Sequence, residues 1–192
     1  TDLFEGIVKR IKEISSKDDE KAKRIVADHI RTSVLIISDG VVPSNTDRGY
    51  ILRRLLRRAI RYADGLGIES GKLEDVAEEV IGSYEDIYNN IAEDKERIKE
   101  EIRNEEESFR KTLQKGMKEF NKLSENDISG EDAFILFSTY GFPLELTLEL
   151  ALERGITVDE EGFKKEFEKH QETSRKGAEQ KFKGGLADTD EK

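Results

Sequence analysis

Apolar residues recur every three or four positions along most of this chain, which is the period of an amphipathic α-helix. The polar run Ser15–Asp19 and Gly40 interrupt the first two such stretches, and Gly65–Gly67 ends the third. Gly141–Pro143 separates two later stretches. The pattern predicts helices over about residues 2–14, 20–39, 47–66, 73–88, 92–123, 131–139, 143–155 and 160–176, with a short extended link at 156–158.

One of these predicted helices is much longer than the others. Residues 92–123 would span roughly 45–50 Å as a helix. Their apolar line is sparse and consists of Ile98, Ile102, Phe109, Leu113, Met117 and Phe120. Such a helix is mostly solvated or connects modules. We therefore expect an all-α fold, a helical bundle with one long helix. The composition agrees, because 40% of the residues are charged, 35% are hydrophobic and only two are prolines.

The helix predicted over residues 47–66 has the most distinctive charge pattern. Its leucines and alanines cluster on one side, and the opposite side carries Arg53, Arg54, Arg57, Arg58 and Arg61. From Arg48 to Arg61 the segment contains six arginines and no acidic residue. Because a guanidinium group is planar, stays charged and donates two parallel hydrogen bonds, this face suits a phosphate backbone.

A second interpretation of the arginine face remains open. The net charge of −10 argues against a nucleic-acid binder unless the 33 basic residues are gathered locally. The arginines could instead pair with acids of the long helix, which carries Glu100, Glu101, Glu105, Glu106 and Glu107. The use of arginine without lysine on this face favours phosphate contact.

Other kinds of site are poorly supported. The chain has no cysteine, which excludes a disulfide, a thiolate nucleophile and a cysteine-based zinc site. Gly65–Lys72 has the wrong glycine spacing for a phosphate loop, and Leu73 stands where Ser or Thr is required. His29 and His170 are far apart, so we expect no metal site and expect His29 to pack inside its helix. The amide of Asn45 could read a base edge, although Asn after Pro-Ser is also an ordinary turn residue.

Three segments together form a specific signature. Arg24–Arg61 reads RIVADHIRTSVLIISDGVVPSNTDRGYILRRLLRRAIR and combines ADHIR, PSN and RGYxLRRxxRRAxR. FSTYGFPLELT (Phe137–Thr147) and ITVDEEGF (Ile156–Phe163) follow. In this order the segments resemble the tRNA-recognition domain of alanyl-tRNA synthetases, and the resemblance covers about residues 1–186.

The resemblance implies recognition of the tRNA(Ala) acceptor stem, as part of an ATP-dependent ligase that attaches alanine to tRNA. In that family tRNA identity rests largely on a G·U wobble pair near the end of the stem, and Asn45 matches the Asn that reads this pair. The usual partner is the Asp of YDTYGFP, where this chain has the uncharged Ser138. We expect Asn45 and Ser138 to face the same base pair. The tRNA-binding residues that we predict are Asn45, Arg48, Arg53, Arg54, Arg57, Arg58, Arg61 and Ser138.

The resemblance also divides the chain. Residues 1–16 correspond to the end of the region leading from the catalytic domain, 17–176 to the helical recognition domain, and 177–192 to a flexible linker toward the editing domain. ATP and Mg²⁺ belong to the family's catalytic domain and Zn²⁺ to its editing domain. We therefore expect no cofactor, metal site or catalytic residue here, and no aminoacylation by this chain alone. The expected partners are the acceptor stem and those two domains of the same longer chain.

The sequence also bears on the cellular location of the protein and leaves two other classes of function open. No stretch approaches 18 consecutive apolar residues, so we expect no membrane span, and the resemblance implies a cytoplasmic protein. The chain could instead be a helical protein-interaction module, which predicts no RNA binding at moderate salt. A helix-turn-helix DNA binder would place the arginine helix in a groove and prefer duplex DNA over an RNA stem.

Overall fold

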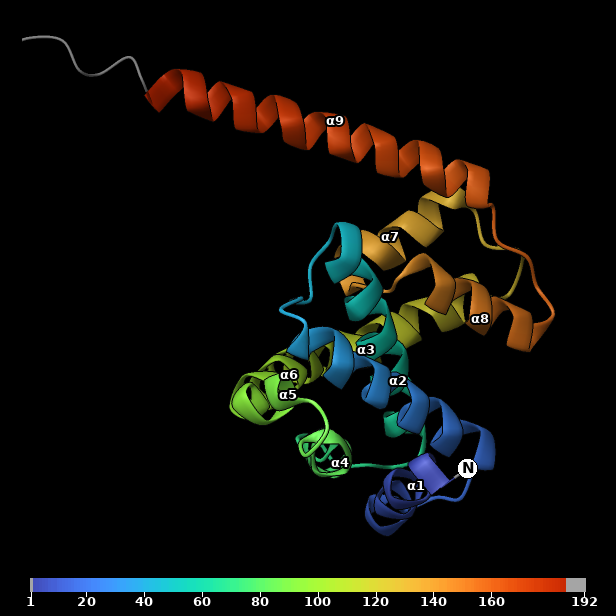
Figure 1. Cartoon of the computed structure of the whole chain (residues 1–192). Helices are drawn as coiled ribbons and strands as arrows, with labels where there is room; N and C mark the ends of the chain where they lie inside the picture. The colour runs from blue at the N-terminus through green and yellow to red at the C-terminus, as the bar shows by residue number, and fades with distance from the viewer. Residues whose placement is uncertain (1, 186–192) are drawn as a thin grey trace, which may run out of the picture. The chain divides into compact units, whose positions relative to one another are not determined.

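The computed structural model describes the backbone of residues 2–185 and the side chains of residues 3–173. Within them nearly all ordered structure is helical, which confirms the predicted all-α class. The helices, labelled in Figure 1, are α1 (Asp2–Ile14), α2 (Glu20–Ser38), α3 (Asp47–Gly65), α4 (Leu73–Tyr84), α5 (Asn89–Glu93), α6 (Lys95–Leu123), α7 (Gly130–Tyr140), α8 (Leu144–Arg154) and α9 (Glu160–Gly185).

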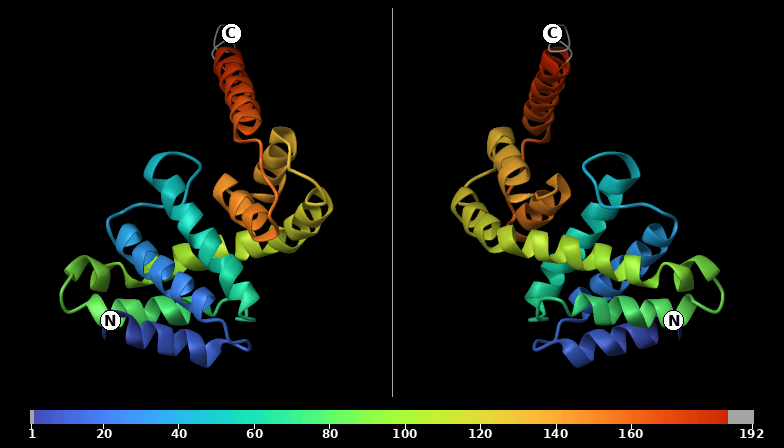
Figure 2. Two further views of the ribbon diagram at one scale, coloured as in Figure 1. Left: turned by 90° about the vertical axis from the view of Figure 1, so that its right-hand side faces the viewer. Right: turned by 90° about the vertical axis from the view of Figure 1, so that its left-hand side faces the viewer.

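The chain forms two compact units, residues 1–115 and residues 116–192. In the first unit α2 is central and packs against α1, α3 and α4, while α1 and α4 lie side by side in both views of Figure 2. Fully buried aliphatic side chains fill the space between these helices, as their periodicity predicts. They include Ile7, Ile11, Val26, Ile30, Val34, Leu52, Ile60, Val76 and Val80.

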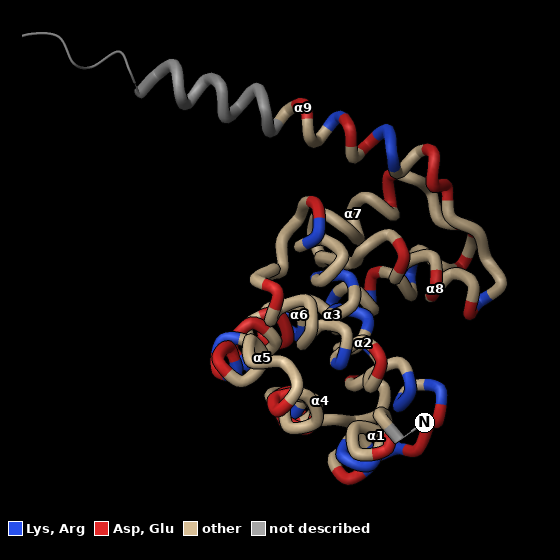
Figure 3. Tube along the Cα trace, in the orientation of Figure 1, with Lys and Arg blue, Asp and Glu red and all other residues tan. Residues whose placement is uncertain are grey.

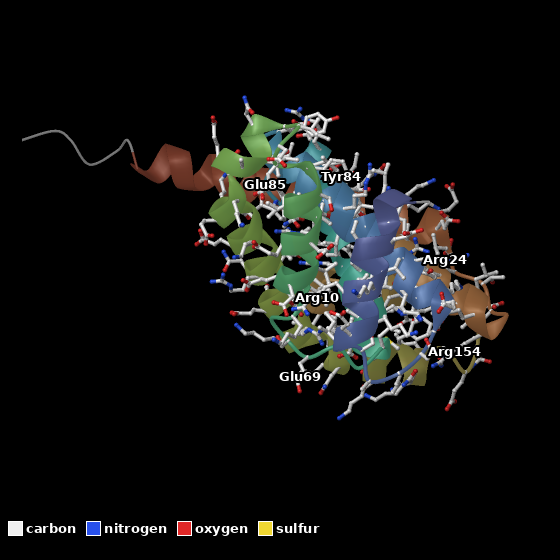
Figure 4. All side chains as sticks on the ribbon, turned by 60° about the horizontal axis from the view of Figure 1, so that its bottom comes forward. Arg10, Arg24, Glu69, Tyr84, Glu85 and Arg154 are labelled. Carbon is white, nitrogen blue, oxygen red and sulfur yellow. The ribbon has the colours of Figure 1, made fainter. Side chains whose placement is uncertain are left out.

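Polar contacts fix the ends and the packing of these helices. Asp19 caps α2 by accepting a hydrogen bond from the backbone N–H of Ala22 at 3.0 Å. Arg10 of α1, labelled in Figure 4, forms an ion pair with Asp75 of α4 at 2.9 Å. Arg31 of α2 donates from Nε to the hydroxyl of Tyr84 at 2.6 Å, which ties α2 to the end of α4. Hydrogen bonds and an ion pair therefore join the helices around the edge of the apolar core.

In the second unit α7 and α9 pack through aromatic rings. Phe137 of α7 contacts Phe163 and Phe167 of α9 edge-on, with ring centroids 5.7 and 5.4 Å apart. The helices approach so closely that a Cβ on Gly130 would lie 2.4 Å from the Cα of Gly162, and the absence of a side chain on Gly130 allows this packing. Residues 156–158 form the predicted extended link, and Val158 pairs with Ile128 in one isolated bridge.

Three predicted helix boundaries are wrong. α4 ends at Tyr84 instead of continuing to residue 88, and the separate helix α5 follows. Ile87 continued the apolar line in the sequence, but its side chain is 70% exposed and so does not hold a helix against the core. The long helix begins at Lys95, three residues later than predicted. α9 continues to Gly185, past the predicted end at residue 176; the remainder of the predicted linker, residues 186–192, lies outside the described residues.

Candidate nucleic-acid interface

The loop of residues 41–46, between α2 and α3, carries Asn45 with its side chain exposed. Ser44 organises this loop: its backbone N–H donates to the carbonyl of Gly49 at 3.1 Å, and its hydroxyl donates to the carbonyl of Thr46 at 2.9 Å. The loop lies directly against the first turn of α3, since a Cβ on Gly49 would come within 2.2 Å of Ser44 Oγ and 2.5 Å of the carbonyl oxygen of Val42. Gly49 is therefore required for this close approach.

Arg53, two turns into α3, connects this loop to α6. One terminal nitrogen donates to the amide oxygen of Asn45, and the other donates to the carbonyl of Pro43 at 3.3 Å. Its Nε donates to Glu105 Oε2 at 3.3 Å. The guanidinium group thus binds three partners at once, which its planar fork of donors allows.

Arg57, one turn further along α3, shares the same carboxylate. Its Nε donates to Glu105 Oε1 at 2.6 Å, and its guanidinium lies over the ring of Phe109 at 5.0 Å from the centroid. Burial lowers the pKa of Arg57 below its ordinary value, while the charge of Glu105 opposes this effect. For Arg53 and Arg57 the structure therefore shows the acid pairing that the sequence left open; their contact with RNA stays a prediction.

Arg58 and Arg61 of α3 both lie beside Tyr62. Their guanidinium carbons are 5.7 Å and 4.8 Å from the centroid of the ring. A terminal nitrogen of Arg58 also lies 3.0 Å from Nε2 of His29 on α2, and the other ring nitrogen of His29 is 2.9 Å from Asp28. Because Arg58 can only donate, Nε2 accepts and Nδ1 carries the proton of a neutral ring. His29 is buried, as predicted.

Arg48 and Arg54 complete the predicted face, whose arginines are coloured blue on α3 in Figure 3. Arg48 lies in the first turn of α3, three positions after Asn45, and its side chain is exposed. Within the described residues it makes no ion pair or side-chain hydrogen bond. Arg54 is partly exposed. Of the six predicted arginines, Arg48 is thus the one most accessible to an external phosphate.

Ser138 lies in the last turn of α7, with its side chain exposed. α7 ends directly after it, where Gly141 takes a left-handed φ of 71° and Pro143 precedes α8. Asn45 belongs to the first unit and Ser138 to the second, so their joint placement at one base pair stays a prediction.

Among the described residues there is no group of three or more His, Asp or Glu side chains that could hold a metal ion. None of the helices within residues 2–185 is long and apolar enough to cross a membrane.

Comparison with known proteins identifies the family. A sequence model of the family described as "tRNA synthetases class II (A)" matches residues 1–191. The chain belongs to this family. Because the match covers nearly the entire sequence, it includes the Asn45 loop, the arginine helix and the α7–α8 turn.

Individual members of the class II (A) family are also similar to the chain. It is 50% identical to the alanine–tRNA ligase of Borreliella afzelii (strain PKo) over 200 aligned residues, which cover 98% of the chain and 34% of the relative. Identity to the Treponema denticola alanine–tRNA ligase is 48%, over 100% of the chain and 34% of the relative. The Thermotoga maritima alanine–tRNA ligase is 44% identical over 91% of the chain. The chain spans about a third of the length of the first of these relatives.

Sequence reasoning missed two residues that shape this site. The sequence indicates Glu105 only as one of several acids on the long helix, and Gly49 only as part of the RGYxLRR signature, with no role of its own. A signal existed for Gly49, because a glycine in the first turn of a helix lowers helix stability and so suggests close backbone approach. No signal indicated which glutamate would face α3, because that depends on how the two helices pack.

Proposed function

We propose that this chain is the tRNA-recognition part of an alanine–tRNA ligase, and that it binds the acceptor stem of tRNA(Ala). Membership of the class II (A) family and the named relatives support the ligase assignment. One observation carries the RNA-binding proposal: exposed Asn45 and exposed Arg48 lie three residues apart at the start of α3. Asn45 can form hydrogen bonds with a base edge, and Arg48 can bind the neighbouring phosphate.

The distribution of charges supports a small RNA-binding surface that is centred on the start of α3. Arg53 and Arg57 share Glu105, so its carboxylate already offsets one of their two positive charges. Arg48 at the start of α3 is the first candidate phosphate ligand, and the partly exposed Arg54, Arg58 and Arg61 are further candidates. RNA helices display base edges in a wide, shallow minor groove. A loop side chain such as Asn45 can reach such a groove without inserting a whole helix.

A binding titration tests the proposal against its alternatives. Fluorescence anisotropy would compare a labelled hairpin of the tRNA(Ala) acceptor stem with a DNA duplex of the same sequence. We expect the RNA hairpin to bind more tightly at moderate salt. Preference for DNA would favour the helix-turn-helix alternative, and no binding of either probe would favour a protein-interaction module.

The role of Arg48 has a matched control on the same unit. Arg48→Gln should weaken RNA binding and reduce the slope of log K against log salt by roughly 0.7–0.9, the value for one lost phosphate contact. Lys111→Gln removes the same charge from an exposed position on α6 and should leave the slope unchanged. Equal slopes for the two variants would exclude Arg48 as a phosphate ligand.

Catalysis is expected to need parts of the enzyme beyond this chain. We propose that the purified 192-residue chain neither forms alanyl-adenylate nor charges tRNA. Alanine-dependent exchange of pyrophosphate into ATP measures the first step directly. Activity above the no-enzyme control in this assay would contradict the proposal that adenylate formation needs parts of the enzyme beyond this chain.

A further inference from the structure

The amide of Asn45 is held in one orientation by its contact with Arg53. An arginine side chain only donates hydrogen bonds, so the amide atom that faces its terminal nitrogen must be the oxygen. The amide nitrogen therefore points away from Arg53. Asn45 is exposed, and in the part of the chain that the structure describes its amide nitrogen has no hydrogen-bond partner. The side chain thus offers two N–H donors to solvent.

Arg53 is itself fixed from the opposite side. Its Nε is bound by Glu105, whose side chain is 7% exposed and also accepts from Arg57. A terminal nitrogen of Arg53 holds the carbonyl of Pro43, two residues before Asn45. The donors of Arg53 therefore hold the loop of residues 41–46 and α6 in place, which leaves this guanidinium poorly disposed to bind an external phosphate.

We propose that Arg53, oriented by Glu105, is a positioning residue that makes Asn45 a hydrogen-bond donor to the RNA base edge. This inference rests on the proposed function and refines it, because Arg53 is reassigned from phosphate contact to control of base readout. The partner atom of Asn45 is then an acceptor: purine N3 or pyrimidine O2 in the minor groove. The exocyclic amino group of guanine, a donor, is not its partner.

A donor fixed in this way can distinguish two base pairs by position. The bases of a wobble pair are displaced relative to those of a Watson–Crick pair, so the acceptors on the minor-groove edge lie at different places. An amide free to rotate could exchange its oxygen and nitrogen and adapt to either pair. Because Arg53 prevents that exchange, the preference for G·U over G·C should depend on Arg53 as strongly as on Asn45.

The test measures affinities of the 192-residue chain for acceptor-stem hairpins with a G·U, G·C or inosine·U pair. Arg53→Lys keeps the charge but cannot form the planar fork. In the unchanged chain we expect a preference for G·U over G·C of roughly 5- to 150-fold. Arg53→Lys should reduce this preference to about the preference that Asn45→Ala shows. The salt slope should not change, and the double variant should lose no more than either single variant. Arg48→Gln, the control, should weaken all three hairpins equally.

Two further measurements keep the test decisive if Arg53→Lys folds poorly. Asn45→Asp retains an oxygen for Arg53 but removes the N–H donors, so it should lose the G·U preference while remaining folded by circular dichroism. Inosine lacks the amino group of guanine. Asn45→Ala should therefore weaken binding to the inosine·U hairpin by the same factor as to the G·U hairpin.

Each contrary outcome identifies which proposal fails. If Asn45→Ala loses the preference and folded Arg53→Lys keeps it, the positioning role is overturned while the proposed function stands. A flatter salt slope for Arg53→Lys, or an Asn45→Asp variant that still discriminates, also overturns the inference. If the unchanged chain binds no RNA or binds the G·U and G·C hairpins equally, the proposed function fails and the inference fails with it.

Discussion

Replacing Glu105 by Gln should destabilise the first unit strongly, because one carboxylate serves two arginines. The side chain of Glu105 is 7% exposed, and those of Arg53 and Arg57 are 22% and 14% exposed. Removing one partner of a buried ion pair costs about 3–5 kcal/mol, whereas an exposed pair contributes about 0–1 kcal/mol. Arg53 keeps its contacts with Asn45 and Pro43, so we expect a loss of about 2–4 kcal/mol.

The physical basis of this estimate is the burial of Arg57. Burial lowers the pKa of Arg57, and the charge of Glu105 is the main opposing influence. A glutamine at position 105 could still accept hydrogen bonds but would no longer offset the cost of keeping two cations away from water. Stacking on Phe109 would retain part of the interaction of Arg57.

Urea unfolding followed by tyrosine fluorescence suits this prediction. Tyr50, Tyr62, Tyr84 and Tyr88 lie in the first unit, and Tyr140 lies in the second, so the signal reports mainly on the first unit. The expected loss corresponds to a midpoint lower by about 1–2 M urea, with the slope unchanged. Glu107→Gln, at an exposed position on α6, is the control and should change stability by less than about 0.5 kcal/mol. Equal midpoints for the two variants would show that the charge of Glu105 contributes little to the stability of the first unit.

Three further predictions follow from other contacts. Gly49→Ala should destabilise the chain by roughly 1–3 kcal/mol in urea unfolding and weaken the G·U preference, because the new Cβ meets Ser44 and a backbone carbonyl. The control is Gly82→Ala, at a helical position with open space, which should instead stabilise the chain by about 0.5–1 kcal/mol. Burial raises the pKa of Glu106 above 4.5, so near that pH the folded state binds more protons than the unfolded state. The free energy of unfolding, measured against pH and compared with that of Glu106→Gln, should therefore fall as pH rises through the folded pKa of Glu106. A difference between the two proteins that stays constant with pH would contradict this. Ser138→Asp should sharpen the preference for a G·U hairpin about fivefold or more in anisotropy titrations, and an unchanged ratio would exclude a shared base pair.

The helical fold could be predicted from the sequence because its periodicity and end signals are local. Asp19 and Gly141 mark helix ends in the sequence and do so in the structure. The end of α4 could not be predicted in this way. Ile87 fits the apolar period but is exposed, and only packing against the rest of the unit reveals this.

The sequence allows the residues of the candidate site to be predicted, but not the contacts between them. The sequence shows that Asn45 precedes an arginine-rich helix, and a resemblance to a family suggests its role. It does not show that Arg53 reaches back over eight residues to Asn45 while Glu105 binds Arg53 from another helix. Such contacts depend on the rotation and register of α3 against α6, which residue types alone leave undetermined.

Discrimination between base pairs by the unmodified chain decides whether it recognises the acceptor stem. Anisotropy titrations would measure the dissociation constants of two acceptor-stem hairpins that differ only in one base pair, G·U or G·C, at the same salt concentration. We expect the G·U hairpin to bind more tightly, by roughly 5- to 150-fold. Equal dissociation constants for the two hairpins would contradict it.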